Sequence, residues 1–383
     1  MSLITYLSRV HFADHVLEDA LGEELKRASS RRPMVVHDRP EPGSDPAERL
    51  HDALPPGCEA VLFEPGSGDA IGTEGGARGK DLKVAARQFS EAGCDAVIGL
   101  GGPRALDFAR MLGWMLASRR RASRFDVGPS PPTIAIPTTI GNIGLGPIEI
   151  AGLTPGSLRP APAVILCDPT LIADPPDSAA TAASGFDIMC HCVEAFLGTT
   201  FNPPADGIAL EGVRRMSDIF EAVLRGSGRA DAGREMMGAA LCAGLAAEKG
   251  LGGVEALGRA LEAEAGGGVR HGQFHAALLP PVLEFNAPAL GDRLERIAEA
   301  MRLAPGSDVP AALAALGRRL GLPGHLSDAA FSRDALARAA SAAASQTANR
   351  TNPRLATEAD YAALLDAAHR AANHGLSGER VAR

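Results

Sequence analysis

The chain has 383 residues, with 38 Lys and Arg against 46 Asp and Glu, which gives a formal net charge of −8. This acidic balance argues against nucleic acid or an anionic membrane as a partner, because both attract basic proteins. A composition of 45% hydrophobic and 22% charged residues is typical of a globular protein and excludes a disordered one. At roughly 100–200 residues per domain, the length predicts about two domains.

Targeting and redox signals are absent from the sequence. No apolar run approaches the roughly 20 residues of a membrane-spanning helix, and the first residues lack the pattern of a signal peptide. We therefore expect a cytoplasmic protein. The six cysteines have no paired spacing, which favours free thiols. The sequence has only four lysines, so arginine carries nearly all the positive charge; they are Lys26, Lys80, Lys83 and Lys249.

The first part of the chain alternates short apolar runs with amphipathic stretches, a pattern typical of βαβ units. The predicted strands are residues 33–38, 60–63, 95–100, 133–137 and 163–166. The predicted helices are residues 14–27, 80–92 and about 105–117. These elements predict a Rossmann-like α/β domain with a parallel sheet, and we assign it residues 1–167.

Beyond Asp168-Pro169 the strand-like runs stop and alanine-rich helical periods dominate. The predicted helices are residues 179–197, 209–224, 233–248, 254–265, 274–285, 293–301, 309–320 and 358–373. This change predicts an all-helical domain over residues 168–383. The fold class is therefore α/β plus all-α.

The first motif is the junction at which the predicted strand 95–100 runs through Gly101-Gly102 into a helix. Backbone amides and the helix N-terminus can meet a phosphate at such a junction. Two glycines alone are weak evidence, because glycine suits any tight turn.

The second motif is a pair of polar residues in an apolar helix, Asp187 and His191. The spacing i, i+4 places both side chains on one helical face, where they can converge on a divalent ion. A hydrogen bond at the helix surface is the commoner outcome, but the apolar neighbours favour a buried polar site. His271 and His275 repeat the spacing, and such nitrogen and oxygen donors suit Fe²⁺ or Zn²⁺.

Together these motifs resemble the iron-containing alcohol dehydrogenase family, and within it the maleylacetate reductase branch. The resemblance covers nearly the whole chain. Its landmarks are Gly101-Gly102, Pro137-Thr138-Thr139, Asp168-Pro169, Gly185 through His191, His271-Gly272, Leu279-Pro280, Phe285-Asn286 and Thr351 through Arg354. It implies an architecture like that of dehydroquinate synthases, with a nucleotide-binding α/β domain, a helical metal and substrate domain, and a homodimer.

The resemblance also implies an oxidoreductase with NAD or NADP and a divalent metal in the interdomain cleft. Hydride would pass between the nicotinamide and a small alcohol or carbonyl substrate, while the metal acts as a Lewis acid. The residues implied for the cofactor are Asp38, Gly101, Gly102, Arg104, Asp107, Thr138 and Thr139. A carboxylate at Asp38 would accept a hydrogen bond from the ribose 2′-hydroxyl and favour NAD.

The implied metal ligands are Asp187, His191, Glu255 and His271. Here the chain departs from the family, because Glu255 stands where a ligating histidine is expected and Arg259 where a second histidine is expected. Glu255 can ligate Fe²⁺ or Zn²⁺, or it can form an i, i+4 ion pair with Arg259 in a site that has lost its metal. Both interpretations stay open at this point.

Two function hypotheses follow. In the first, the chain is an NAD(P)-dependent dehydrogenase or reductase in which Arg259 binds a substrate carboxylate and His275 transfers a proton. In the second, it no longer transfers hydride and is a non-redox enzyme or a binding protein for an anionic ligand. The second hypothesis rests on departures from the family pattern at functional positions, among them Pro103 and Arg104. Pro103 removes an amide donor from the phosphate loop. Dehydroquinate synthase chemistry is less consistent, because its phosphate-handling lysines have no counterpart here.

Overall fold

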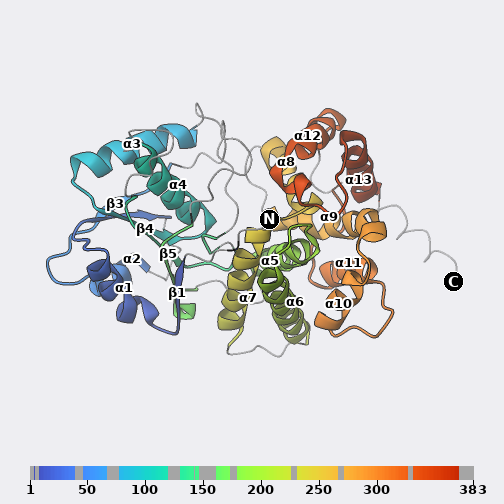
Figure 1. Ribbon diagram of the computed structural model, residues 1–383, viewed down its shortest axis with the longest axis horizontal. Coiled ribbons are helices and arrows are strands. Elements are labelled where there is room, and N and C mark those ends of the chain that lie inside the picture. Colours follow the sequence, from blue (N-terminus) through green and yellow to red (C-terminus); the bar gives the residue numbers. More distant parts are fainter. Residues whose placement is uncertain are drawn as a thin grey trace, which may run out of the picture. The chain divides into compact units, whose positions relative to one another are not determined.

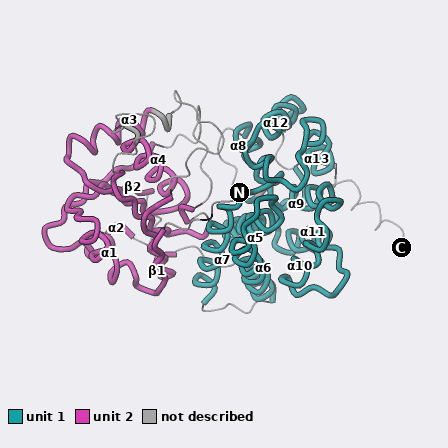
Figure 2. The backbone as a smooth tube through the Cα atoms, viewed as in Figure 1, with its two compact units in different colours: residues 1–4, 175–383 teal, residues 5–174 magenta. Residues whose placement is uncertain are grey.

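The computed structural model describes residues 4, 8–38, 46–66, 77–119, 130–141, 143–145, 161–172, 179–225, 231–265, 271–326 and 331–370. The chain divides into two compact units, one of residues 5–174 and one of residues 1–4 with 175–383 (Figure 2). The first contains a sheet with helices, and the described residues of the second form helices without strands (Figure 1). The predicted fold class is confirmed.

The α/β unit is built on a six-stranded parallel sheet. Its strands are β1 (Arg9–Phe12), β2 (Pro33–His37), β3 (Val61–Phe63), β4 (Ala96–Gly101), β5 (Thr133–Pro137) and β6 (Val164–Cys167), in the order β1-β6-β5-β4-β2-β3. From β2 the chain adds β3 on one side, and from β4 it adds β5 and β6 on the other. The adjacent carboxyl ends of β2 and β4 are therefore the topological switch point, where open α/β sheets bind ligands.

Helices cover both faces of this sheet. Helices α1 (Val16–Arg27) and α2 (Pro46–Ala53) share a buried core with Val35 and Ile98. Helices α3 (Ala77–Glu91) and α4 (Pro103–Arg119) share another with Met34, Val36 and Val97. Neighbouring residues of one strand thus enter opposite cores, which is the period of two that a strand buried on both faces requires.

The helical unit surrounds α5 (Ala179–Leu197), which is buried along most of its length and packs against α6, α7 and α9. The other helices are α6 (Pro203–Leu224), α7 (Ala232–Ala246), α8 (Gly253–Ala265), α9 (His271–Asn286), α10 (Arg293–Ala300), α11 (Val309–Arg319), α12 (Arg333–Ser345) and α13 (Glu358–Arg370). Short 3₁₀ turns are η1 (Pro169–Leu171), η2 (Ala247–Lys249), η3 (Ala287–Ala289) and η5 (Thr347–Arg350). Across the described ranges, no helix has an apolar stretch long enough to cross a membrane.

The carboxyl end of α5 is held by two cationic side chains, the buried Lys249 and the partly exposed Arg293. The Phe196 carbonyl oxygen accepts hydrogen bonds from Lys249 Nζ at 2.8 Å and from Arg293. Lys249 is 2% exposed and also donates to Asp206 Oδ1 at 2.5 Å. Burial lowers the pKa of Lys249, whereas Asp206 raises it. Positive charge at this position compensates the negative end of the helix dipole.

Several elements differ from the predictions. Strand β1, a short edge strand with polar residues, was not predicted, and neither were α2 and α12. Helix α6 begins at Pro203 instead of 209, because Asn202 Oδ1 accepts from Ala205 N and two prolines occupy the first helical positions. Helix α9 begins at His271 instead of 274 and continues through Pro280 and Pro281.

Candidate active site

At the switch point, a carboxylate lies against the glycine turn. Asp38 directly follows β2, and its Oδ2 accepts a hydrogen bond from Gly102 N at 2.9 Å. Gly101 has φ +143°, and a Cβ there would lie 2.7 Å from Asp38 Oδ2. The turn therefore requires glycine both for its backbone conformation and for the close approach of this carboxylate.

An arginine completes this corner of the sheet. Arg104, in the first turn of α4, donates from Nε to Asp38 Oδ1 at 3.2 Å and from Nη2 to the Pro65 carbonyl oxygen at 3.2 Å. Thr138 N donates to Gly101 O at 3.0 Å, and a Cβ on Gly102 would lie 3.1 Å from Thr139 Oγ1. Six of the seven residues predicted for the cofactor therefore lie together at this corner, namely Asp38, Gly101, Gly102, Arg104, Thr138 and Thr139. The seventh lies further along the helix.

That residue is Asp107, which lies one turn further along α4. Its Oδ1 accepts a hydrogen bond from the buried Arg110 at 3.1 Å. The assignment of Asp107 to the cofactor stays a prediction.

In the helical unit, one face of α5 meets α9 at a cluster of possible metal donors. Asp187 Oδ1 lies 2.9 Å from His275 Nδ1 and 3.5 Å from His191 Nε2. Each of the three residues offers a donor atom, and these atoms all lie within 4.8 Å of one another. Three nitrogen and oxygen donors that leave a position open are the usual protein ligands of a catalytic divalent ion. The residues present therefore fit a metal ion.

Helix α8 adds a second carboxylate to this cluster. Glu255 is 1% exposed, and its Oε2 lies 3.0 Å from His191 Nε2 while its Oε1 accepts from Arg259 Nε at 2.5 Å. The ion pair predicted for Glu255 and Arg259 is thus present beside the metal donors, and Glu255 still faces a histidine of the cluster. The side chain of His271, predicted as a ligand, lies outside the described residues.

A glycine allows α5 and α9 to approach each other at the cluster. A Cβ on Gly272 would lie 2.2 Å from the Ala183 carbonyl oxygen and 3.0 Å from the Asp187 Cβ. Any side chain at this position would force the helices apart. Gly272 therefore brings Asp187 within reach of His275, one turn further along α9.

Two residues that hold the start of α8, Glu194 and Asn352, were not predicted from the sequence. Glu194, one helical turn after His191 on α5, accepts hydrogen bonds from the backbone N–H groups of Gly252, Val254 and Glu255 at 2.6–3.1 Å. Burial raises the pKa of Glu194 to about 7, although the amide hydrogen bonds lower it. Asn352 Oδ1 accepts from Gly253 N at 3.0 Å. The signal in the sequence that could have identified Glu194 is its position, an acidic residue in an apolar helix on the same face as Asp187.

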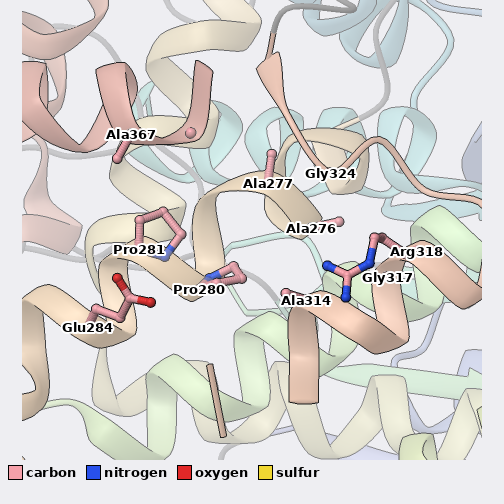
Figure 3. A pocket seen from close by; sticks show the side chains of 11 residues that line it. Ala276, Ala277, Pro280, Pro281, Glu284, Ala314, Gly317, Arg318, Gly324 and Ala367 are labelled. Carbon is pink, nitrogen blue, oxygen red and sulfur yellow. The ribbon is translucent and has the colours of Figure 1, made fainter. Parts of the chain in front are cut away.

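A separate cavity of about 220 Å³ lies along α9, α11 and the end of α13. Alanine, proline and glycine residues dominate its lining, and Figure 3 shows Glu284 and Arg318 on opposite sides of Pro280. None of the predicted site residues lines this cavity. It contributes no metal donor to the cluster, although Ala276 in its wall follows His275.

Comparisons with known proteins identify the family to which the chain belongs. The family model of iron-containing alcohol dehydrogenase matches residues 8–143, and that of the C-terminal part of the Fe-containing alcohol dehydrogenase family matches residues 181–369. The chain is 32% identical to 4-hydroxybutyrate dehydrogenase of Cupriavidus necator, covering 96% of this chain and 99% of that protein. Maleylacetate reductase 1 of Cupriavidus pinatubonensis is 26% identical, covering 81% of each.

A solved structure supports the same fold. Alcohol dehydrogenase from Oenococcus oeni superposes with a TM-score of 0.80 at 23% identity, covering 96% of this chain and all of that one. The family uses NAD(P) and a metal ion, and its members transfer hydride. This chain belongs to the iron-containing alcohol dehydrogenase family and is a hydride-transferring oxidoreductase.

Proposed function

We propose that the protein oxidises a small hydroxy acid of the 4-hydroxybutyrate type, or reduces the corresponding aldehyde acid. The observation that carries this proposal is the position of Arg259, whose guanidinium bonds the Glu255 carboxylate beside His191. A guanidinium binds a carboxylate with a planar, two-pronged geometry. The names of two relatives, 4-hydroxybutyrate dehydrogenase and maleylacetate reductase, are those of enzymes acting on carboxylates.

We propose that Asp187, His191 and His275 hold the metal ion, since their donor atoms lie within 4.8 Å of one another. Glu255 and His271 remain further ligands predicted from the sequence. A bound Fe²⁺ or Zn²⁺ supplies Lewis acidity toward the substrate oxygen. Metal analysis of untreated protein identifies the ion, and comparing Glu255→Gln with His275→Asn decides which side chain is required to retain it.

The chain's own residues bind and orient the reactants. At the switch point, Asp38 and the turn at Gly101 and Gly102 would hold the dinucleotide, which would supply the hydride acceptor or donor. In the oxidation, the alcohol carbon loses a hydride and its hydroxyl loses a proton. Arg259 orients the distant carboxylate. Proton transfer, the role predicted for His275 from the sequence, is an alternative to coordination of the metal ion by this side chain. Loss of metal from His275→Asn would support coordination, whereas retained metal with an altered pH dependence of kcat would support proton transfer.

Steady-state kinetics with 4-hydroxybutyrate and 1-butanol test the substrate, because these compounds differ in one carboxylate. We expect kcat/KM to favour 4-hydroxybutyrate and Arg259→Met to reduce it by about 10- to 100-fold, the effect of losing one charge-assisted hydrogen bond. The value for 1-butanol should change little. Arg259→Lys keeps the positive charge but removes the two-pronged geometry. It provides a second measurement of kcat/KM if the methionine variant folds poorly.

A matched control is Arg338→Met, which removes an Arg–Glu pair between α12 and Glu264 of α8, with the arginine side chain 62% exposed. It should leave both substrates unaffected. Equal kcat/KM for the two substrates would refute the role of Arg259. Absence of turnover together with absence of dinucleotide binding would refute the proposed function.

The homodimer and the cytoplasmic location stay predictions. Light scattering on the purified protein measures its mass and tests the homodimer.

A further inference from the structure

The Asp38 carboxylate does not face the cofactor position alone. Arg104 Nε lies 3.2 Å from Asp38 Oδ1, and the side chains are 32% and 27% exposed, respectively. Arg104 Nη2 reaches the carbonyl oxygen of Pro65, two residues beyond β3. The guanidinium therefore spans the carboxyl ends of β2 and β3, and it remains partly accessible to a ligand there.

This pairing changes the charge that an adenosine ribose would meet. An isolated carboxylate after β2 accepts the 2′-hydroxyl of NAD and repels the 2′-phosphate of NADP. Paired with Arg104, the carboxylate has its charge balanced, and Asp38 Oδ2 is already bonded to Gly102 N. An arginine fork beside this position provides the donors that a phosphate prefers.

The dinucleotide site of the proposed function can thus accept either ribose. With NAD, Asp38 can accept the 2′-hydroxyl while its pair with Arg104 is kept. With NADP, Arg104 can turn from Asp38 to the 2′-phosphate through a change of side-chain rotamer, and the Gly102 amide still neutralises part of the Asp38 charge. No movement of the sheet is required.

We propose that Arg104 is a specificity-determining residue that admits the 2′-phosphate, so that the protein binds NADPH as well as NADH. This inference rests on the proposed binding of a dinucleotide at the switch point. It differs from the expectation drawn from Asp38 alone, which favours NAD.

Calorimetric titration with NADH, NADPH, 5′-AMP and 2′,5′-ADP tests the inference without turnover. The two small probes differ in the 2′-phosphate and do not depend on the nicotinamide. We expect the parent protein to bind NADPH within about tenfold of NADH. Arg104→Ser should weaken NADPH and 2′,5′-ADP by about tenfold or more, the effect of one charge-assisted hydrogen bond, and should change NADH and 5′-AMP by less than about threefold.

The matched control is Arg87→Ser on α3, where an arginine side chain 79% exposed pairs with Glu91. It should alter none of the four affinities. Equal weakening of NADH and NADPH by Arg104→Ser, or binding of NADH without NADPH by the parent, would overturn the inference. Binding of none of the four probes would instead refute the proposed function.

Discussion

The contact between α5 and α9 predicts a specific effect of Gly272→Ala. The new Cβ would lie 2.2 Å from the Ala183 carbonyl oxygen, and ordinary van der Waals contact begins near 3.4 Å. The helices must therefore separate by on the order of 1 Å, since the opposing atom belongs to backbone and cannot rotate away. Overpacking of this kind costs about 1–3 kcal/mol of unfolding free energy.

The same displacement acts on the metal cluster, because Asp187 lies on the face that α9 would push away. A misplacement of about 1 Å can lower catalysis by about 10²-fold. We expect Gly272→Ala to lower both kcat and the metal content, while NADH affinity stays unchanged because the glycine turn belongs to the other unit. Denaturant unfolding, metal analysis and calorimetry measure the three quantities.

Gly207→Ala on α6 is the control, because no atom lies within 4 Å of the Cβ that it would add. Removing a glycine from an unobstructed helical position stabilises a helix by about 0.5–1 kcal/mol. The two substitutions should therefore change the unfolding free energy in opposite directions. If Gly272→Ala matches the control in stability and retains its metal and kcat, the reasoning about helix approach is wrong.

Two further predictions concern stability. The Arg9 hydrogen bond holds the pKa of Glu24 below its usual range, so the stabilisation is present above the ordinary carboxyl pKa and is lost as the pH falls through the lowered value. Between about pH 6 and pH 3, the parent should lose more unfolding free energy than Glu24→Gln, and equal losses would contradict this pairing. Lys249→Met should cost about 1–3 kcal/mol, because the Phe196 carbonyl and Asp206 lose the hydrogen bonds that Lys249 donates. Lys26→Met, at a side chain 69% exposed, should change stability by less than about 0.5 kcal/mol. Similar costs for both variants would refute the stabilising role of Lys249.

The sequence predicted the elements whose pattern is local. Strands β4 and β5 can be recognised because burial on both faces leaves a continuous apolar run. Helix α5 can be recognised from the helical spacing of its apolar residues. The edge strand β1 has no such spacing, since pairing with β6 supplies its stability. The start of α6 depends on the cap that Asn202 provides. The apolar spacing further along the helix carries no information about this cap, so the start was predicted too late.

The parts of the candidate sites that lie within one helix or one turn could be predicted from the sequence. The i, i+4 spacing of Asp187 and His191 and the glycines after β4 are visible in the chain. The contact of Glu194 with the start of α8 joins residues about 60 positions apart, so spacing could not identify it. The Asp38 pair with Arg104 likewise depends on the adjacency of β2 and β4, which only the sheet order establishes.

The distribution of lysines has a practical consequence. Lys249 is buried against the end of α5, whereas the other three lysines lie on α1 and α3 of the α/β unit, where their side chains are exposed. Among the described residues, the helical unit therefore offers no accessible lysine amine to an acylating reagent. A surface or dye coupled through lysine would attach to the α/β unit, and the metal cluster would remain unmodified.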